Sequence, residues 1–354
     1  MAEATMAARS MATATVVADT STEVTEMAVV RKNVLKDTAA CQAFISGVKL
    51  LKAEDSTFST TDFGIAGPPA KVRTYDLFVI WHILAMRTAV PPGGDPDIRN
   101  AAHLGPIFLP WHRMMLSLME ANLQRVLGDP AFGLPYWDWT DDTGHGDPTD
   151  SDLWKPSRMG GSGPAPFGGT VTDGPFAFDE ADPGTFRVRI TANSTLNMIR
   201  TSRGLRRALG VDVSTVPSKA DVDALFDVRS PSGDPALATY DFEPWDGSSI
   251  GFRNRLEGFI PFGLHNLVHV FVGRDMGLAS SPNDPVFYLH HCNVDRIWER
   301  WMDHNGRNYL PDQSAPAILR GHRLKDPIVS PLGSAATPET VLDPTSLYTY
   351  DQLS

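Results

Sequence analysis

Several histidines of this 354-residue chain lie inside segments whose apolar pattern predicts burial. His82 falls within residues 74–89 (TYDLFVIWHILAMRTA), which are apolar on all sides, as in a helix without a solvent-exposed face. His265 and His269 are four residues apart in LHNLVHV, so on a helix both imidazoles project from one face. A fold that buries these segments as helices therefore buries their histidines as well.

Two more predicted helices carry histidines. Pro110 opens a helix that ends at Leu127, and His112 shares its apolar face with methionines and leucines at three- and four-residue spacing. A final helix follows Pro285, includes His290 and His291 near its start, and ends at about residue 304. We also expect helices at 195–209 and 221–226, and an irregular segment rich in glycine and proline at 140–185.

The number of these histidines points to a transition metal. Burying imidazoles without partners costs roughly a few kcal/mol each, so a shared metal ion is the simplest account. Neutral imidazole binds zinc, copper, iron and nickel. Di-iron bundles supply Glu-x-x-His pairs, which the sequence lacks, so copper is favoured over iron. A zinc hydrolase would lack the general base of an HExxH motif. For any single pair of histidines, the alternative is that both are structural residues of the core with hydrogen-bond partners in the protein.

Composition excludes several other classes of protein. Apolar residues make up 42% and charged residues 21%, which is ordinary for a folded globular chain, and 29 glycines and 28 prolines indicate many loops. The formal charge of −11 argues against a nucleic-acid partner. No apolar run is long enough to predict a membrane span.

The two cysteines, Cys41 and Cys292, cannot form a disulfide framework or a thiolate metal site. Residues 1–27 lack a continuous apolar core and carry Arg9 as their only basic residue, so they make a poor secretory signal. We therefore expect a disordered tail at 1–27, a folded domain at 28–354 and a cytoplasmic location, with secretion alongside a partner protein as the alternative.

Five segments carry a resemblance to a known family: LPWHR (109–113), LPYWDW (134–139), FRNRLEG (252–258), LHNLVHVFVG (264–273) and SPNDPVFYLHHCNVDRIWERW (281–301). Together they resemble the type 3 copper proteins of the tyrosinase family, particularly its short bacterial members, over residues 30–354. The resemblance implies a mainly α single domain with a central four-helix bundle that holds a dinuclear copper site, surrounded by loops. It also implies that O2 is the co-substrate.

The resemblance assigns six histidines to the two copper ions. The first copper would be held by His82, His103 and His112, and the second by His265, His269 and His291. Helical periodicity alone leaves His290 and His291 as alternatives, and the family motif selects the second. Three other histidines match no ligand position and are expected in loops or at the surface: His145, His304 and His322.

Two residues near His265 match family positions that hold a water molecule. Glu257 aligns with the carboxylate that orders this water, and Asn266 with the asparagine that polarises it. Together they would take the proton of an incoming monophenol, which is general-base chemistry through one water. The alternatives are a helix-surface salt bridge of Glu257 with Arg253 or Arg255 and a helix-terminal hydrogen bond of Asn266.

The loop after His269 and the end of the chain set expectations about access. Ala279 and Ser280 occupy positions where some relatives have bulky blocking residues, which predicts an open entrance to the site. Arg274 in the same loop would either attract acidic aromatic substrates or be a solvated loop residue. Residues 348–350 match the Tyr-x-Tyr motif that ends the catalytic core of relatives, so no C-terminal lid domain is expected. Some bacterial relatives receive copper from a small caddie protein, which is a candidate partner here.

The resemblance therefore predicts a copper oxidoreductase that hydroxylates monophenols at the ortho position and oxidises o-diphenols to o-quinones. An o-aminophenol or catechol oxidase with little activity on monophenols is the first alternative, because ligand histidines do not distinguish the two. An oxygen carrier like hemocyanin, which uses a similar copper site without turnover, is the second alternative.

Overall fold

The structure is a computed structural model that describes residues 28–163, 169–226, 235–330 and 335–353. The expected tail at 1–27 lies outside the described residues. The helices are α2 (Thr38–Ala53), α3 (Thr74–Arg87), α4 (Phe108–Leu127), α5 (Lys219–Asp223), α6 (Phe252–Glu257), α7 (Leu264–Val272), α8 (Val286–Asn305) and α9 (Pro338–Val341). The strands form two-stranded pairs: β1 (Val29–Arg31) with β8 (Tyr348–Tyr350), β2 (Asp55–Ser59) with β3 (Lys71–Arg73), β4 (Gly169–Thr170) with β7 (Arg206–Arg207), and β5 (Val188–Ala192) with β6 (Met198–Arg203).

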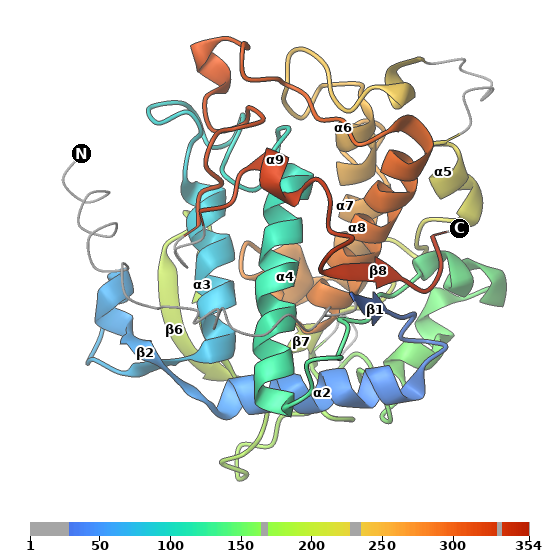
Figure 1. Cartoon of the computed structure of the whole chain (residues 1–354). Coiled ribbons are helices and arrows are strands. Elements are labelled where there is room, and N and C mark those ends of the chain that lie inside the picture. Colours follow the sequence, from blue (N-terminus) through green and yellow to red (C-terminus); the bar gives the residue numbers. More distant parts are fainter. Residues whose placement is uncertain (1–27, 164–168, 227–234, 331–334, 354) are drawn as a thin grey trace, which may run out of the picture.

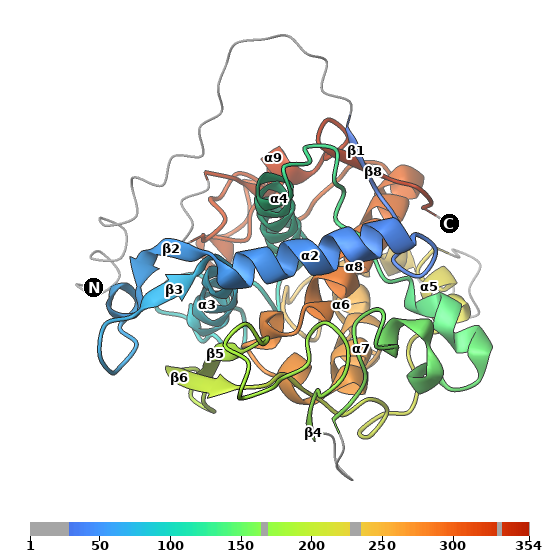
Figure 2. The ribbon, with the colours of Figure 1, turned by 90° about the horizontal axis from the view of Figure 1, so that it is seen from below.

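The centre of the fold is helical, as predicted. Helices α3, α4, α7 and α8 form its core, and α2 crosses beneath α3 and α4 (Figure 1, Figure 2). Gly47 allows α2 to approach α4 closely, because a Cβ there would lie 2.6 Å from Leu123 Cδ2. The predicted helix beginning at Pro110 starts two residues earlier, at Phe108. In the described part of the chain no helix combines the length and apolarity that crossing a membrane requires.

The helix expected at 195–209 is wrong, because the region forms strand β6 of an antiparallel hairpin with β5 and then strand β7, which pairs with β4. The Asn193 side chain closes the turn, since its Oδ1 accepts the backbone N–H groups of Thr195 and Asn197. Val188 and Ile190 on the paired strand point into the core. Turn-forming asparagine and alternate burial together favour a hairpin over a helix here.

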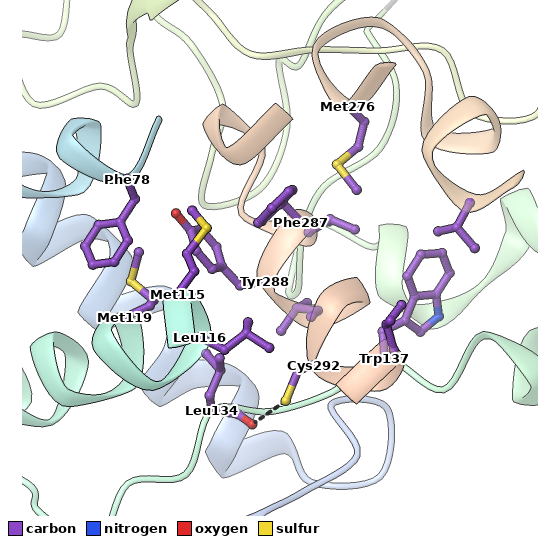
Figure 3. Packing of buried hydrophobic residues seen from close by; sticks show 14 of the residues in the cluster. Phe78, Met115, Leu116, Met119, Leu134, Trp137, Met276, Phe287, Tyr288 and Cys292 are labelled. Carbon is purple, nitrogen blue, oxygen red and sulfur yellow. Dashed lines mark hydrogen bonds between the residues drawn. The ribbon is translucent and has the colours of Figure 1, made fainter. Parts of the chain in front are cut away.

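Large buried side chains from three helices pack together in the core (Figure 3). Phe78 of α3, Met115 of α4 and Tyr288 of α8 are fully or almost fully buried there. Cys292 is also buried, and its thiol donates to the Leu134 carbonyl at 3.3 Å (Figure 3). Burial raises the pKa of this thiol to about 12, so it stays protonated and acts as a core residue.

A buried ion network ties both ends of the described chain to the core. Asp295 on α8 accepts from Arg113 Nε at 2.6 Å and from Arg31 Nη1 at 3.2 Å. The same carboxylate accepts the hydroxyls of Tyr348 at 2.7 Å and Tyr350 at 2.6 Å. The Tyr-x-Tyr segment is therefore strand β8, which is held against α8 by its two phenols.

Candidate metal centre

Three histidines of the first half of the chain converge on one point. His82 comes from α3, His112 from α4, and His103 from the loop between these helices. One ring nitrogen of each lies within 4.8 Å of the corresponding atoms of the other two. Such a spacing fits three ligands around one metal ion.

Backbone carbonyl groups orient two of these rings. The Nδ1 atom of His82 lies 2.7 Å from the Ala279 carbonyl, and that of His112 lies 2.8 Å from the Phe108 carbonyl. Each Nδ1 therefore carries the proton, which leaves Nε2 with a lone pair. Both Nε2 atoms are buried, and neither has a hydrogen-bond partner among the residues that the structure describes. This is the arrangement that a metal ligand requires.

The second cluster consists of His265 and His269 on α7 with His290 and His291 on α8, whose nitrogen atoms also lie within 4.8 Å of one another. His265 Nδ1 lies 3.1 Å from the Glu257 carbonyl, and His269 Nδ1 lies 2.6 Å from the Met276 carbonyl. Their Nε2 atoms each lie 3.3 Å from His291 Nε2. Three nitrogen atoms thus converge here as well.

His290 differs from its neighbour in its surroundings. Its ring stacks on His265 with a centroid separation of 5.0 Å and meets Trp139 edge-on. Both of its ring nitrogens are buried without a hydrogen-bond partner in the described residues. The Nε2 atom of His291, by contrast, faces both histidines of α7. The geometry therefore favours His291, although distance alone admits His290 to the cluster.

The two clusters face each other across the α4–α8 contact. The rings of His112 and His291 are stacked at 4.2 Å between centroids, and His103 and His265 lie 6.3 Å apart. Phe287 packs against His82 and His291, with centroid separations of 5.3 and 4.1 Å. Two metal ions held by these clusters would thus be close neighbours in an apolar setting.

Burial also sets the charge of the imidazoles. It lowers the pKa of His82 and His269 to about 4, because a charged ring loses its hydration there. Burial and neighbouring histidines hold the pKa of His103, His112, His265 and His291 well below the ordinary value. All six rings are therefore neutral at pH 7, which is the form that binds metal.

Glu257 is fully buried and contacts both halves of the centre. Its Oε1 accepts the Leu104 backbone N–H at 2.8 Å, one residue after His103, and its Oε2 accepts from Arg253 at 2.7 Å. The Arg253 pair predicted as an alternative is thus present, although in the core and not on a helix surface. Burial outweighs Arg253 and raises the pKa of Glu257 to about 7.

A hollow of about 330 Å³ opens above the clusters. It is lined by His82, Met86, Asn100, His103, Leu104, Phe259, Phe262, His265, Asn266, His269, Val270, Met276, Gly277, Leu278, Ala279 and Ser281. Asn266 is therefore at the hollow, and its Oδ1 lies 3.0 Å from His265 Nδ1. Glu257 lies behind the wall and is not a lining residue.

The three residues predicted to control access to the site lie in three different environments. Ala279 lines the hollow with its small side chain. Ser280 is buried, and its hydroxyl lies 2.9 Å from that of Thr191, so it belongs to the core. Arg274 is exposed in the short turn after α7 and does not line the hollow. Of the three, only Ala279 is placed to affect entry directly.

His322 lies in a loop, as expected, but it is not at the surface. It is fully buried, and its ring packs against the loop that carries His103, since a Cβ on Gly105 would lie 2.7 Å from His322 Cε1. Its polar neighbours in the sequence gave no sign of this burial. His304 is exposed as expected, and the side chain of His145 lies outside the described residues.

Comparison with known proteins identifies the family. Residues 72–304 match the family described as the common central domain of tyrosinase. The chain belongs to the tyrosinase family. It is 40% identical to a tyrosinase of Streptomyces antibioticus over 278 residues, which cover 78% of this chain and 89% of that relative. It is 34% identical to the grixazone synthase of Streptomyces griseus, with 78% and 90% covered.

Solved structures agree on the fold. A polyphenol oxidase of Thermothelomyces thermophila superposes with a TM-score of 0.65 at 21% identity, covering 92% of this chain and 89% of that one. A functional unit of octopus hemocyanin also shares the fold, with a TM-score of 0.50, 19% identity, and 92% and 69% covered. The predicted mainly α fold and the predicted tyrosinase-type copper oxidoreductase are thus confirmed, and the two histidine clusters fit the dinuclear copper centre that the family implies.

Proposed function

We propose that the chain oxidises phenols with O2 at a pair of copper ions. A monophenol and O2 give an o-quinone and water, and two o-diphenols and O2 give two o-quinones and two waters. The observation that carries the proposal is the pair of facing histidine clusters. In them, backbone carbonyls accept from Nδ1 of four histidines and leave their Nε2 atoms free to bind metal: His82, His112, His265 and His269.

His82, His103 and His112 would hold one copper ion, and His265, His269 and His291 the other. When bound, the copper pair supplies O2 binding and the transfer of two electrons from the substrate. The protein keeps its six imidazoles neutral and fixed, and Phe287 keeps the space between the clusters apolar. His290 stacks behind His265 and supports its ring.

Glu257 and Asn266 would manage the substrate proton. A water held by the Asn266 side chain at the hollow takes the phenol proton and passes it to the Glu257 carboxylate. Each carboxylate oxygen has two lone pairs, so the contacts with Leu104 and Arg253 leave acceptor capacity. A pKa of about 7 for Glu257 suits a base that works near neutral pH.

An o-aminophenol or catechol oxidase is the second candidate. The relative named grixazone synthase, which matches 78% of this chain, supports it. An oxygen carrier is disfavoured because the similar relatives from Streptomyces are named as tyrosinases and a synthase. A small copper-delivering caddie protein is proposed as a further partner, on the family resemblance alone.

The test is a substrate panel on copper-loaded protein. Tyrosine, 4-hydroxybenzoate, a catechol and o-aminophenol are supplied in turn, while O2 consumption and quinone absorbance are recorded. Oxidation of a monophenol after a lag supports the first candidate. Oxidation of catechol and o-aminophenol only supports the second, and O2 binding without turnover of any of the four contradicts both.

A further inference from the structure

His103 differs from the other proposed copper ligands in how it is held. It lies in the loop between α3 and α4, whereas the other five lie on helices. Its Nδ1 atom is buried without a hydrogen-bond partner in the part of the chain that the structure describes. The Nδ1 atoms of His82 and His112, by contrast, each contact a backbone carbonyl. The position of the His103 ring therefore depends mainly on the backbone of its loop.

This backbone has an unfavourable conformation that other segments hold in place. Leu104 has a φ of +63°, in the left-handed region, which is costly for a residue with a Cβ. Asn100 Oδ1 accepts the backbone N–H groups of Ala102 at 3.1 Å and of His103 at 2.8 Å. Glu257 Oε1 accepts that of Leu104 at 2.8 Å. These contacts hold the loop as far as Leu104, and the next residue packs on a different segment.

That next residue, Gly105, packs on the buried ring of His322. A Cβ at Gly105 would lie 2.7 Å from His322 Cε1 and 3.0 Å from Nδ1, so the imidazole leaves no room for a side chain. The third neighbour of this Cβ would be Arg99 Cδ at 3.4 Å, which is an ordinary contact. Of the described atoms outside residues 104–106, only those of the His322 ring are therefore too close.

The segment that carries His322 is itself well held. The His322 carbonyl accepts the Tyr309 hydroxyl at 2.6 Å. On either side of His322, Gly321 and Arg323 donate their backbone N–H groups to Asp326 Oδ2, at 2.6 and 3.2 Å. The imidazole is fully buried between these anchored residues and the loop. It therefore provides a fixed surface against which Gly105 rests.

We propose that His322 is a positioning residue for the first metal site, because its ring supports Gly105 and thereby sets the place of His103. The proposal rests on the proposed function, in which His103 holds copper together with His82 and His112. Without the ring, Asn100 and Glu257 hold the loop on one side of Gly105 only, and His103 is free to move away from the other two ligands. The first copper ion should then be lost before the second.

Gly105→Ala and His322→Ala test the contact from its two sides. In Gly105→Ala the added methyl group collides with the ring and displaces the loop, so the affinity of the first site for Cu(II) should fall by about tenfold or more. His322→Ala removes the support and should also lower this affinity. In the double variant the methyl group enters the vacated space, so copper should bind more tightly than in Gly105→Ala alone.

Gly161→Ala is the matched control. Its new Cβ would lie 3.7 Å from the nearest described atom outside its chain neighbours, the Trp154 carbonyl oxygen, which is an ordinary contact. The same type of substitution is therefore made without a collision and far from both histidine clusters in the sequence. This variant should bind copper as the wild type does.

Copper retention is the first measurement. The full chain is loaded with copper and dialysed against a chelator at increasing concentration. Where wild type retains both ions, Gly105→Ala and His322→Ala should retain about one per chain. A single Cu(II) ion gives an electron paramagnetic resonance signal, whereas two closely coupled Cu(II) ions do not. The variants should therefore show this signal, and a loss of stability alone would not produce it.

Hydrogen exchange of the metal-free protein is the second measurement, and it does not depend on copper. The N–H groups of Ala102, His103 and Leu104 are hydrogen-bonded, so they should exchange slowly in wild type. Mass spectrometry of a peptide that contains them should show exchange about tenfold faster in both single variants. The double variant should exchange more slowly than Gly105→Ala.

Copper retention and exchange at the wild-type level in His322→Ala would overturn the proposal. A defect of Gly105→Ala that persists unchanged in the double variant would also overturn it, since His322 would then not be the obstacle. If circular dichroism shows that His322→Ala does not fold, His322→Asn replaces it, because asparagine lacks Cε1, the atom nearest to Gly105. If wild type bound no copper, the proposed function would fail, while hydrogen exchange would still test the contact.

Discussion

Glu257→Gln is the substitution that best separates a catalytic base from a structural carboxylate. Glutamine retains one oxygen that accepts the Leu104 N–H, and it cannot take a proton at neutral pH. If Glu257 is the base, removing it should lower monophenol turnover by about 100-fold, which corresponds to about 2.7 kcal/mol in activation free energy. Catechol turnover should change little, because a catechol loses its protons in stages during oxidation.

The structure also predicts a cost to stability from the same substitution. Glu257 Oε2 receives a buried hydrogen bond from Arg253 at 2.7 Å, and a neutral amide replaces this ionic contact. A hydrogen bond to a charged group contributes about 1.5–3 kcal/mol to the free energy of unfolding. Arg253 keeps its other partner, Asp241, at 2.8 Å, so the guanidinium is not left unpaired.

Asp241→Asn is the matched control. It removes the other half of the same buried pairing, and Asp241 does not line the hollow. We expect a similar loss in the free energy of unfolding, measured by urea denaturation. The ratio of monophenol to catechol kcat/KM should stay at the wild-type value in this variant.

The assay compares kcat/KM for 4-ethylphenol and for 4-methylcatechol in wild type and both variants, with copper content measured for each. A ratio that falls only in Glu257→Gln supports the base. An equal loss on both substrates, together with reduced copper content, would show instead that Glu257 only positions the His103 loop and the α7 cluster. That result would refute the assignment of Glu257 as a base.

Three further predictions follow from the site. Metal analysis of copper-loaded protein should give two copper ions per chain, and one zinc ion with no copper would contradict the ligand assignment. His269→Ala should abolish oxidation while the exposed His304→Ala should not, with circular dichroism as the check on folding. Burial lowers the pKa of His322 to about 3. Between about pH 6.5 and 3 the unfolded chain therefore binds a proton that the folded chain excludes, and the free energy of unfolding decreases by about 1.4 kcal/mol for each unit by which the pH is lowered. His322→Leu should show a shallower fall in urea midpoints over pH 7 to 5, and an unchanged slope would contradict this.

The sequence predicts the ligand-bearing helices well because their apolar residues recur at helical spacing. Burial follows directly from that pattern, and His82, His112, His265 and His269 lie within it. The hairpin of β5 and β6 was missed because short segments with mixed apolar and polar residues support either helix or strand. There the deciding feature is pairing with residues earlier in the chain.

Contacts between distant segments could not be predicted. Glu257 and Leu104 are 153 residues apart, and no local pattern indicates that the carboxylate accepts this N–H. His322 stands among polar residues in RGHRLKD, yet it packs beneath the loop of His103. The resemblance supplied the position of Glu257, but only the structure reveals that it contacts both halves of the centre.

These contacts make Glu257 a physical link between the two clusters. Its backbone carbonyl accepts from His265 Nδ1, while its carboxylate fixes the loop that carries His103. A displacement of α6 would therefore move a ligand of each copper ion at once. The reaction of O2 with two copper ions requires a fixed separation between the metals. Glu257 would help to keep this separation by constraining both histidine clusters, whether or not it also accepts a proton. If Glu257 is also the base, the position of its carboxylate depends on the same contacts that hold the two histidine clusters together.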